Sequence, residues 1–391
     1  MKKERSKKRS NTYYKVIYKL FLPIFRIVAF FVYGVVAIPK KYKEPILVLA
    51  NHTSDMDFVV VAAHISNHMY FVCDRHVVDK GLFGKLFNRW FNPVAVFKGS
   101  YKMAEVMDII RRVRSGGSIL LFPEGRLSHN GKTLYIDPAT AKLAKALKCR
   151  VVTFRSSGGY FKQPRWQERM NTGWLFSSGI VNEYDKEYVQ NAPVEELLQH
   201  IREDLYVDAY AEQAKKKRRF WFKRGTEGIT RYYDVCPKCH SIDTLYTFRH
   251  RVTCWCGYEM KLDSYGYLHG DPQIVSTPVE WEALQNEVYR RNFEAGAYFM
   301  EERAMMLFEF RDKCERSLNT LIGFGKLEGR PDRFKFGEYE FLFGKIEKME
   351  IMLGGRWLVF GYDGHHYMIS DNDACFNKYI ELYMWATNRP M

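Results

Sequence analysis

The sequence predicts an α/β chain with a mostly parallel sheet, followed by a small cysteine-bearing module and an α+β module of antiparallel strands. Three observations predict this order. Short apolar runs alternate with helical patterns over the first half of the chain, as in parallel sheets with crossover helices. Four cysteines then cluster within about twenty residues. The last part alternates apolar and polar residues between turn residues.

Composition and charge narrow the class of protein. The 391 residues are 47% hydrophobic and 16% aromatic, which excludes a disordered chain, and 27 Gly and 13 Pro without a period exclude a collagen-like fibre. The net charge of +15 is concentrated in residues 1–45, with a net of +10, and residues 215–224, with +7, which leaves −2 for the rest. Such basic segments favour nucleic acid, an anionic membrane or phosphorylated substrates as partners.

The N-terminal segment, residues 1–44, is expected to associate with a membrane. Its apolar part is interrupted by Lys19, Pro23 and Arg26, and its longest uncharged stretch has thirteen residues. A spanning helix needs about 20 apolar residues, and no clear cleavage site of a secretory signal follows. We expect a helix that lies in the cytoplasmic face of an anionic membrane. The alternative is an amphipathic helix packed on the next domain.

The predicted α/β domain covers residues 45–214. Its short apolar runs predict buried strands, at residues 46–50, 118–122 and 150–154. Its helical patterns lie at residues 58–65 and 140–148. Ligands of such sheets bind beyond the carboxyl ends of the strands, and two polar segments, NHTSDMD and PEGR, follow the first two strands.

NHTSDMD contains a histidine and a carboxylate at a suggestive spacing. Asp57 can fold back on one imidazole nitrogen of His52 and fix its tautomer, so that the other nitrogen can act as a general base on a substrate hydroxyl. The alternative is a capping cluster, in which Asn51, Ser54 and Asp55 cap the next helix and the histidine is incidental.

PEGR contains three residues that could hold a ligand. Glu124 can accept a hydrogen bond from a substrate hydroxyl, Gly125 lets a ligand approach the backbone, and Arg126 can bind a phosphate through two N–H groups. The alternative is a tight turn with a surface Glu–Arg pair.

Together, in this order and about seventy residues apart, the two segments resemble the motif blocks of the glycerolipid acyltransferases that act on 1-acyl-glycerol-3-phosphate (lysophosphatidate). NHTSDMD matches the NHxxxxD block, with His52 and Asp57 in the paired positions, and FPEGRLS (122–128) matches the FPEG block. In the intervening stretch, Lys98 is the candidate for the family's basic residue. The resemblance covers about residues 13–210.

The resemblance implies a membrane-associated O-acyltransferase. His52 would remove the proton of the acceptor hydroxyl, Asp57 would orient His52, and the hydroxyl oxygen would attack the thioester of acyl-CoA or of an acyl carrier protein. The expected acceptor is a lysophospholipid, foremost 1-acyl-glycerol-3-phosphate, and the product is then phosphatidate. The acceptor's polar end would be held by Glu124, Gly125, Arg126 and Lys98.

Residues 215–231 are expected to form a linker between this domain and the cysteine-bearing module. The run KKKRRFWFKR mixes basic residues with Phe220, Trp221 and Phe222, a mixture that favours contact with anionic lipid headgroups. It could also stack on single-stranded nucleic acid or be a solvated linker.

Residues 232–270 resemble a zinc ribbon. Structural zinc takes four thiolates from paired cysteines, and here these would be Cys236, Cys239, Cys254 and Cys256. His240 and His250 are possible substitute ligands, and two disulfides are the alternative that a reducing cytosol disfavours. The isolated cysteines are expected to be buried small side chains: Cys73, Cys149, Cys314 and Cys375.

Residues 275–391 are predicted to form an antiparallel module. Ser276 and Thr277 are candidate caps of its first helix, a strand meander follows, and residues 374–389 predict a closing helix. This order resembles a pleckstrin-homology-like or GRAM-like barrel, which implies docking to lipid, protein or the neighbouring domain. Two histidines are expected in a solvated hairpin turn: His365 and His366.

Two alternative functions stay open. The first keeps the chemistry but acts on a different lysolipid acceptor. The second is a non-catalytic zinc-ribbon adaptor at the membrane. Nucleic acid is not expected as a partner, because the ribbon region has equal numbers of acidic and basic residues.

Overall fold

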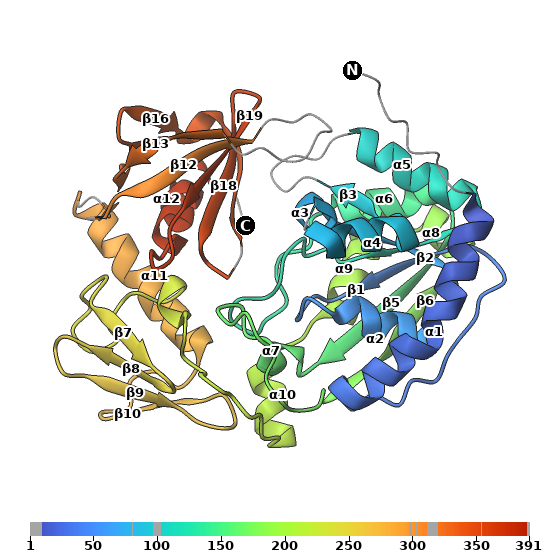
Figure 1. The fold of residues 1–391 in the computed structure, drawn as a ribbon, viewed down its shortest axis with the longest axis horizontal. Helices are drawn as coiled ribbons and strands as arrows, with labels where there is room; N and C mark the ends of the chain where they lie inside the picture. The colour runs from blue at the N-terminus through green and yellow to red at the C-terminus, as the bar shows by residue number, and fades with distance from the viewer. Residues whose placement is uncertain are drawn as a thin grey trace.

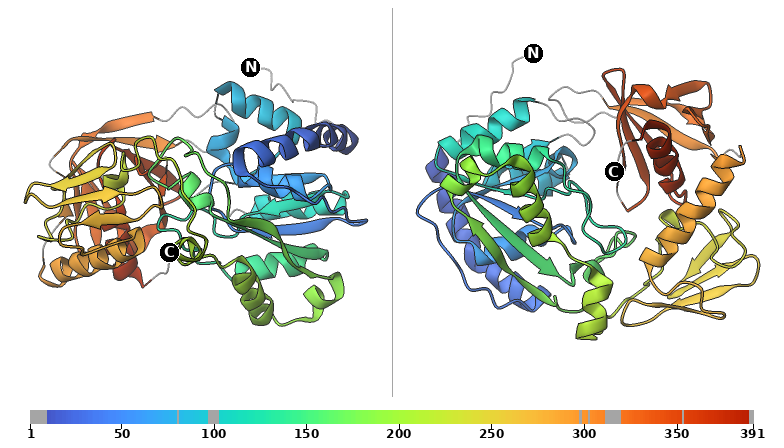
Figure 2. Two further views of the ribbon diagram at one scale, coloured as in Figure 1. Left: turned by 90° about the horizontal axis from the view of Figure 1, so that it is seen from below. Right: turned by 180° about the vertical axis from the view of Figure 1, so that it is seen from behind.

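The computed structural model describes residues 10–79, 81–96, 103–296, 299–301, 303–310, 320–352 and 354–388. Two bodies lie side by side: the α/β unit, and a second body formed by the cysteine-bearing module and the C-terminal module (Figure 1, and two further views in Figure 2). One cluster of buried apolar side chains runs through both bodies, from Phe161 in the α/β unit to Tyr233 and Trp281 in the second body. The two bodies therefore share a core.

The α/β unit is built on a six-stranded sheet with the order β3-β2-β4-β1-β5-β6. All neighbours pair in parallel except β5 and β6. The strands are β1 (Ile46–Ala50), β2 (Met69–Asp74), β3 (Val94–Val96), β4 (Ser118–Leu121), β5 (Arg150–Ser157) and β6 (Ser177–Tyr184). Strand β1 is buried along its whole length, as expected for a parallel strand covered on both faces. The predicted strands and the mostly parallel sheet are confirmed.

Helices connect these strands and cover the sheet (Figure 1). They are α2 (Asp57–His64), α3 (Arg75–Asp79), α4 (Gly81–Phe91), α5 (Met103–Arg114), α6 (Ala139–Leu147), α7 (Gly159–Lys162), α8 (Lys186–Asn191), α9 (Val194–Leu205) and α10 (Ala209–Lys216). Helices α2 and α6 confirm the helices predicted from periodicity.

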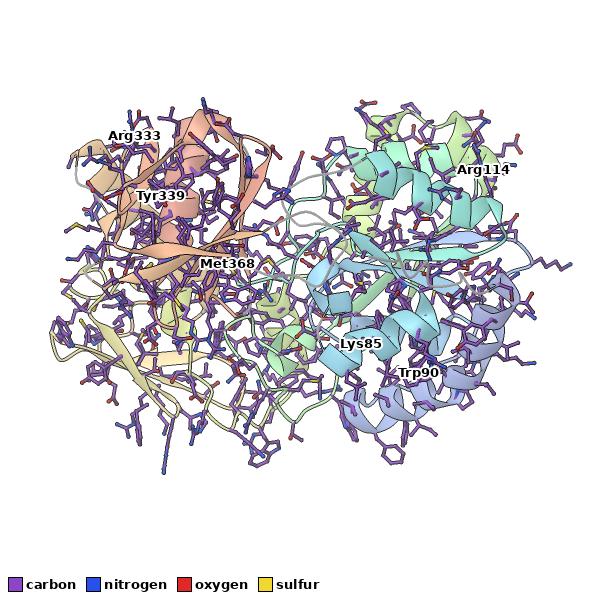
Figure 3. The ribbon with its side chains drawn as sticks, turned by 45° about the horizontal axis from the view of Figure 1, so that its top comes forward. Lys85, Trp90, Arg114, Arg333, Tyr339 and Met368 are labelled. Carbon is purple, nitrogen blue, oxygen red and sulfur yellow. The ribbon has the colours of Figure 1, made fainter. Side chains whose placement is uncertain are left out.

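The N-terminal helix α1 (Asn11–Tyr33) has two different apolar faces. One face is buried in the core of the α/β unit, and its Phe21 lies 5.2 Å, between ring centroids, from Trp90 of α4, a residue labelled beside α1 in Figure 3. The other face is exposed, at 64% for Leu20 and 73% for Phe31. By length and composition alone, α1 is long and apolar enough to cross a membrane. The helix is packed on the domain and still presents an apolar surface.

The second basic segment is part of the core rather than a free linker. Phe220 is fully buried, with its ring centroid 5.2 Å from that of Phe161, whereas Trp221 is 70% exposed. Arg218 binds the carbonyl oxygen of Leu175. The expected linker is therefore anchored by Phe220, and only part of its aromatic surface faces solvent.

The cysteine-bearing module is a four-stranded antiparallel sheet with the order β10-β9-β8-β7. A short 3-10 helix, η1 (Ile229–Arg231), precedes it. Its strands are β7 (Leu245–Phe248), β8 (Arg251–Cys254), β9 (Glu259–Leu262) and β10 (Leu268–Gly270). Strands β7 and β8 form an antiparallel hairpin, in which Leu245 lies opposite Cys254.

The C-terminal module begins with α11 (Pro278–Glu294), whose N-cap Thr277 accepts a hydrogen bond from the N–H of Glu280. Two antiparallel sheets follow, β11-β14-β15-β16 and β13-β12-β19-β18-β17, and α12 (Asn377–Thr387) closes the chain. The strands are β11 (Phe299–Met300), β12 (Met305–Phe310), β13 (Thr320–Gly325), β14 (Leu327–Gly329), β15 (Arg333–Phe336), β16 (Tyr339–Leu342), β17 (Ile346–Met352), β18 (Trp357–Tyr362) and β19 (His365–Ser370). The expected order of elements is observed, while the likeness to a pleckstrin-homology-like barrel stays a prediction.

One expectation for this module was wrong. His365 is exposed, but His366 is only 4% exposed. Both residues lie on β19 rather than in a turn. Since successive side chains of a strand point to opposite faces, the second histidine turns into the interior.

A buried lysine joins the cysteine-bearing module to the C-terminal module. The Nζ of Lys378 on α12 lies 2.6 Å from Asp243, 3.3 Å from Asp234 and 2.6 Å from Glu301. The lysine side chain is 1% exposed. Burial raises the pKa of Asp234 to about 7 and also raises that of Glu301, while Lys378 opposes both shifts. Lys378 is therefore a cation that the three carboxylates share.

Replacing Lys378 by Ala should destabilise the protein strongly, because it leaves buried carboxylates without a cation. We expect a loss of roughly 3–5 kcal/mol in the free energy of unfolding, the range for breaking a buried ion pair, measured by urea unfolding. The control is Lys345→Ala, which removes an exposed pair with Asp363 and should leave the unfolding midpoint nearly unchanged. Equal effects of the two substitutions would contradict the role given to Lys378.

Candidate active site

The two polar segments predicted to act together meet at one edge of the sheet. Strands β1 and β4 are parallel neighbours, with Leu49 opposite Leu121. The chain therefore leaves both strands at the same end, and the loops with His52 and Glu124 come into contact there. This is the carboxyl edge, where parallel sheets bind their ligands.

His52 and Asp57 form the expected pair. The Nδ1 atom of His52 lies 3.1 Å from Oδ2 of Asp57, and the two side chains are 20% and 2% exposed. The same carboxylate accepts the N–H groups of Thr53 at 2.6 Å and Ser54 at 2.9 Å, and the Ser54 hydroxyl at 2.6 Å. An acceptor with this many donors is an ionised carboxylate, which requires the proton of the neutral imidazole on Nδ1. The Nε2 atom is then the nitrogen able to take a proton.

The polar side chains of this segment do not cap helix α2, which was the alternative interpretation. The N-cap of α2 is Met56, which makes no side-chain capping bond. Asn51 instead exchanges two hydrogen bonds with the backbone of β5. Ser54 binds the carboxylate of Asp57. Asp55 accepts a hydrogen bond from the side chain of Gln163, directly after α7. The polar residues of this segment therefore build the loop around the His–Asp pair.

The FPEGR loop supports His52 from a second side. Phe122 stacks on the imidazole, with ring centroids 4.2 Å apart and planes 17° from parallel. The backbone N–H of Ser128 donates to the carbonyl of His52 at 3.2 Å. These contacts limit the rotation of the imidazole, so that its free edge has a fixed direction.

The side chain of Glu124 binds two separate segments of the backbone and does not point outward. Its Oε1 accepts the N–H of His52 at 2.7 Å, and its Oε2 accepts the N–H of Leu134 at 2.8 Å. Burial raises the pKa of Glu124 to about 8, and the two backbone N–H groups act in the opposite direction. The residue was expected to accept from a substrate hydroxyl, but both of its oxygens are used inside the protein.

Gly125 and Arg126 lie in different surroundings. Gly125 has a φ of +70° and open space on its Cβ side, so a ligand can approach the backbone there. Arg126 lies in the electrostatic field of Arg165 and of Glu350, which belongs to the C-terminal module. The arginine of the motif is thus directed to the boundary between the two bodies. Lys98, the fourth expected contact, lies outside the described residues.

A further residue at the site was missed by the motif analysis. A Cβ atom on Gly159 would lie 2.1 Å from Oγ1 of Thr53 and 3.8 Å from Oδ1 of Asp57. The absence of a side chain at this position lets the end of β5 approach the histidine loop. A double glycine directly after a strand of a parallel sheet was the available signal.

The four predicted metal ligands also come together. The Sγ atoms of Cys236, Cys239, Cys254 and Cys256 all lie within 4.8 Å of one another. The Sγ atoms of Cys239 and Cys254 are 3.7 Å apart, and those of Cys236 and Cys256 are 3.8 Å apart. This fits the edge of a tetrahedron around zinc, about 3.8 Å for Zn–S bonds of about 2.3 Å, and it is too long for a disulfide.

The other candidate ligands and cysteines lie elsewhere. His250 accepts the N–H of Gly225 at 3.4 Å and His240 contacts Arg291, so neither histidine joins the thiol cluster. Of the isolated cysteines, Cys149 and Cys375 are buried as expected and Cys73 is half-buried. Cys314 lies outside the described residues.

Comparison with known proteins identifies part of the α/β unit. Residues 29–157 match the family model described as Acyltransferase, and this segment contains both motif loops. Among solved structures, the chain is similar to the 1-acyl-sn-glycerophosphate (LPA) acyltransferase PlsC from Thermotoga maritima, at 19% sequence identity. The likeness covers 52% of this chain and 81% of that chain, with a TM-score of 0.36.

Replacing Gly159 by Ala should disturb the His–Asp pair. The added methyl group forces Thr53 away, and with it a backbone N–H that binds Asp57. We expect a loss of about 1–3 kcal/mol of stability from overpacking and on the order of 10²-fold in any activity that depends on the position of His52. Gly179→Ala is the matched control, because its Cβ would meet no atom within 4 Å. Equal activity of the two variants would argue against this close approach.

Proposed function

We propose that this protein is a membrane-associated O-acyltransferase. It moves a fatty acyl group from acyl-CoA or an acyl carrier protein to the free hydroxyl of a lysophospholipid, foremost 1-acyl-glycerol-3-phosphate, to form phosphatidate. The observation that carries the proposal is the His52–Asp57 pair at 3.1 Å, at the sheet edge, within the segment that matches the acyltransferase family.

The chemistry follows from the pair. Nε2 of His52 takes the proton of the acceptor hydroxyl while Asp57 stabilises the imidazolium. The hydroxyl oxygen forms a bond to the thioester carbonyl carbon, the C–S bond breaks, and the thiol leaves with the proton. No acyl-enzyme is needed. The isolated thiols of the α/β unit suit this view, because burial raises the pKa of Cys73 to about 12 and that of Cys149 to about 11, so that little thiolate forms.

The exposed face of α1 supports a position at a membrane surface, which we propose is the cytoplasmic one. Leu20, Ile27 and Phe31 on this face are more than half exposed, and the exposed Val36 and Ile38 continue it beyond the helix. A helix with one packed face and one apolar outer face can lie in the acyl boundary while the domain stays in water. The acceptor and product, both lipids, can then exchange with the bilayer.

The thiol cluster is proposed to hold one structural zinc ion. The four cysteines supply a full tetrahedral set, so no position is open for chemistry. The ion would fasten the loop before β7 to the turn after β8. A non-catalytic adaptor at the membrane is the second candidate function, and the intact His–Asp pair disfavours it.

Replacing His52 by Ala removes the proposed base. Acyl transfer to 1-acyl-glycerol-3-phosphate should fall roughly 10²–10⁴-fold, the usual contribution of a general base, as measured with a radiolabelled acyl donor. His269→Ala, which alters an exposed pair with Asp263 on the cysteine-bearing module, should keep its activity.

Two results would count against this assignment. Retained activity in His52→Ala would remove the base from the mechanism. A panel of lysolipid acceptors without activity in the intact protein would favour the adaptor. Activity with another lysolipid would retain the mechanism and change the acceptor.

Metal analysis tests the zinc site. The purified protein should contain about one zinc per chain. Cys254→Ser should lose the metal and lower the Tm, whereas Cys73→Ser, outside the cluster, should retain the metal. A protein with no bound zinc, or a Cys254→Ser variant with unchanged metal content, would contradict the assignment.

A further inference from the structure

We infer that the second body completes the active site: Glu282 on α11 is a positioning residue for His52, and it acts through His129 and Asn130 of the loop that follows the FPEGR segment. Glu282 lies outside the segment that matches the acyltransferase family, which ends at residue 157. The role of base given to His52 rests on the proposed function, whereas the contacts that hold His52 can be tested without catalysis.

Helix α11 offers Glu282 to the α/β unit from a fixed position. On the same helix, Trp281 and Gln285 are fully buried. Trp281 donates through Nε1 to the carbonyl of Val235 at 2.8 Å, and Gln285 accepts the N–H of Asp234 at 2.9 Å. A carboxylate between two anchored residues has little freedom to follow a moving partner. The partners of Glu282 are therefore held in place by it.

Glu282 binds two neighbouring side chains of the loop at once. Its Oε1 lies 2.5 Å from Nε2 of His129, and its Oε2 accepts a hydrogen bond from Nδ2 of Asn130 at 2.5 Å. The side chains of Glu282 and His129 are 17% and 12% exposed. Hydrogen bonds to an ionised group are strengthened when they are partly removed from water. The contact therefore fixes this part of the loop firmly.

The charges around Glu282 favour its ionised form. Burial by itself raises the pKa of Glu282, but His129, Asn130 and Arg126 act in the opposite direction, and the resulting pKa lies below the usual value. A second carboxyl group nearby, that of Glu381 on α12, has its pKa raised to about 7 by burial and by the charge of Glu282. An ionised Glu282 requires a proton on Nε2 of His129, so this imidazole is the donor.

The loop is closed by its own hydrogen bonds and can move only as a unit. The Oγ atom of Ser128 donates to the carbonyl of Lys132 at 2.6 Å and accepts the N–H of Gly131 at 2.9 Å. The Oδ1 atom of Asn130 accepts the N–H of Lys132 at 2.9 Å. By binding Asn130, Glu282 therefore holds the whole turn.

This turn is connected to His52 from two sides. The N–H of Ser128 donates to the carbonyl of His52 at 3.2 Å. After the turn, the N–H of Leu134 shares the carboxylate of Glu124 with the N–H of His52. The peptide groups before and after His52 are thus both bound to the loop that Glu282 holds. Without this hold, the backbone that carries the imidazole gains freedom.

Replacing Glu282 by Ala in the full chain should lower the kcat for acyl transfer roughly 10–100-fold, because the base loses its position, and should change the KM for the acceptor little. Glu282→Gln keeps the length of the side chain and one acceptor oxygen, so it should keep more of the kcat, and it carries the test if Glu282→Ala does not fold. The matched control is Glu168→Ala, which removes another ion pair between the two bodies, with Arg356. The control should keep its kcat.

A rise in KM without a loss of kcat in the Glu282 variants would overturn the inference. An equal loss of kcat in Glu168→Ala would also overturn it, because the effect would then belong to the interface in general.

A spectroscopic measurement tests the position of His52 without turnover. In protein with isotope-labelled histidine, the ring nitrogen shifts of His52, assigned by comparison with His52→Ala, report which nitrogen carries the proton. We expect the proton on Nδ1, beside Asp57. The shifts should change in both Glu282 variants and stay the same in Glu168→Ala. Unchanged shifts in the Glu282 variants would overturn the inference. Changed shifts in a protein that acylates no lysolipid would overturn the proposed function alone.

Discussion

The buried carboxylate of Glu124 is the contact on which the arrangement of the site depends. One oxygen accepts the backbone N–H of His52, which follows β1. The other accepts the backbone N–H of Leu134, ten residues after Glu124 in the chain. A pair of parallel strands brings two loops to the same edge, but it does not fix their relative positions to within an ångström. Hydrogen bonds from a buried side chain to backbone N–H groups do so, because buried donors left without a partner are costly. The direction of the imidazole follows from this brace.

The second body extends this support. Glu282 on α11 binds the side chains of His129 and Asn130, directly after the FPEGRLS segment. Tyr233 donates to the carbonyl of His129 at 3.2 Å. The second body therefore holds the loop that supports His52, and the shared apolar core keeps it there. Of the docking partners expected for this module, which were lipid, protein or the neighbouring domain, the structure shows contact with the neighbouring domain of its own chain.

The positive charge of the sequence takes on a different meaning in three dimensions. The sequence divides it between two short basic segments on a nearly neutral body. The structure places Arg126 of the FPEGR loop near Glu350 and Glu282 as well as Arg165, so acidic side chains from the second body act on the charge of this arginine. It also divides the second basic segment, where Phe220 is buried and Trp221 is exposed.

The sequence by itself determined the parallel strands, the pairing of His52 with Asp57 and the cluster of four cysteines. Each depends on a pattern that can be read along the sequence: apolar runs of strand length, two motif blocks in a fixed order, and pairs of cysteines at short spacing. Only the tertiary structure decided three features. Glu124 binds backbone N–H groups, the missing side chain of Gly159 leaves room for Thr53, and Arg126 faces the second body. These outcomes depend on contacts with residues far away in the chain, and on burial, which changes what a side chain can bind. A motif specifies which groups are present, and packing determines in which direction each of them points.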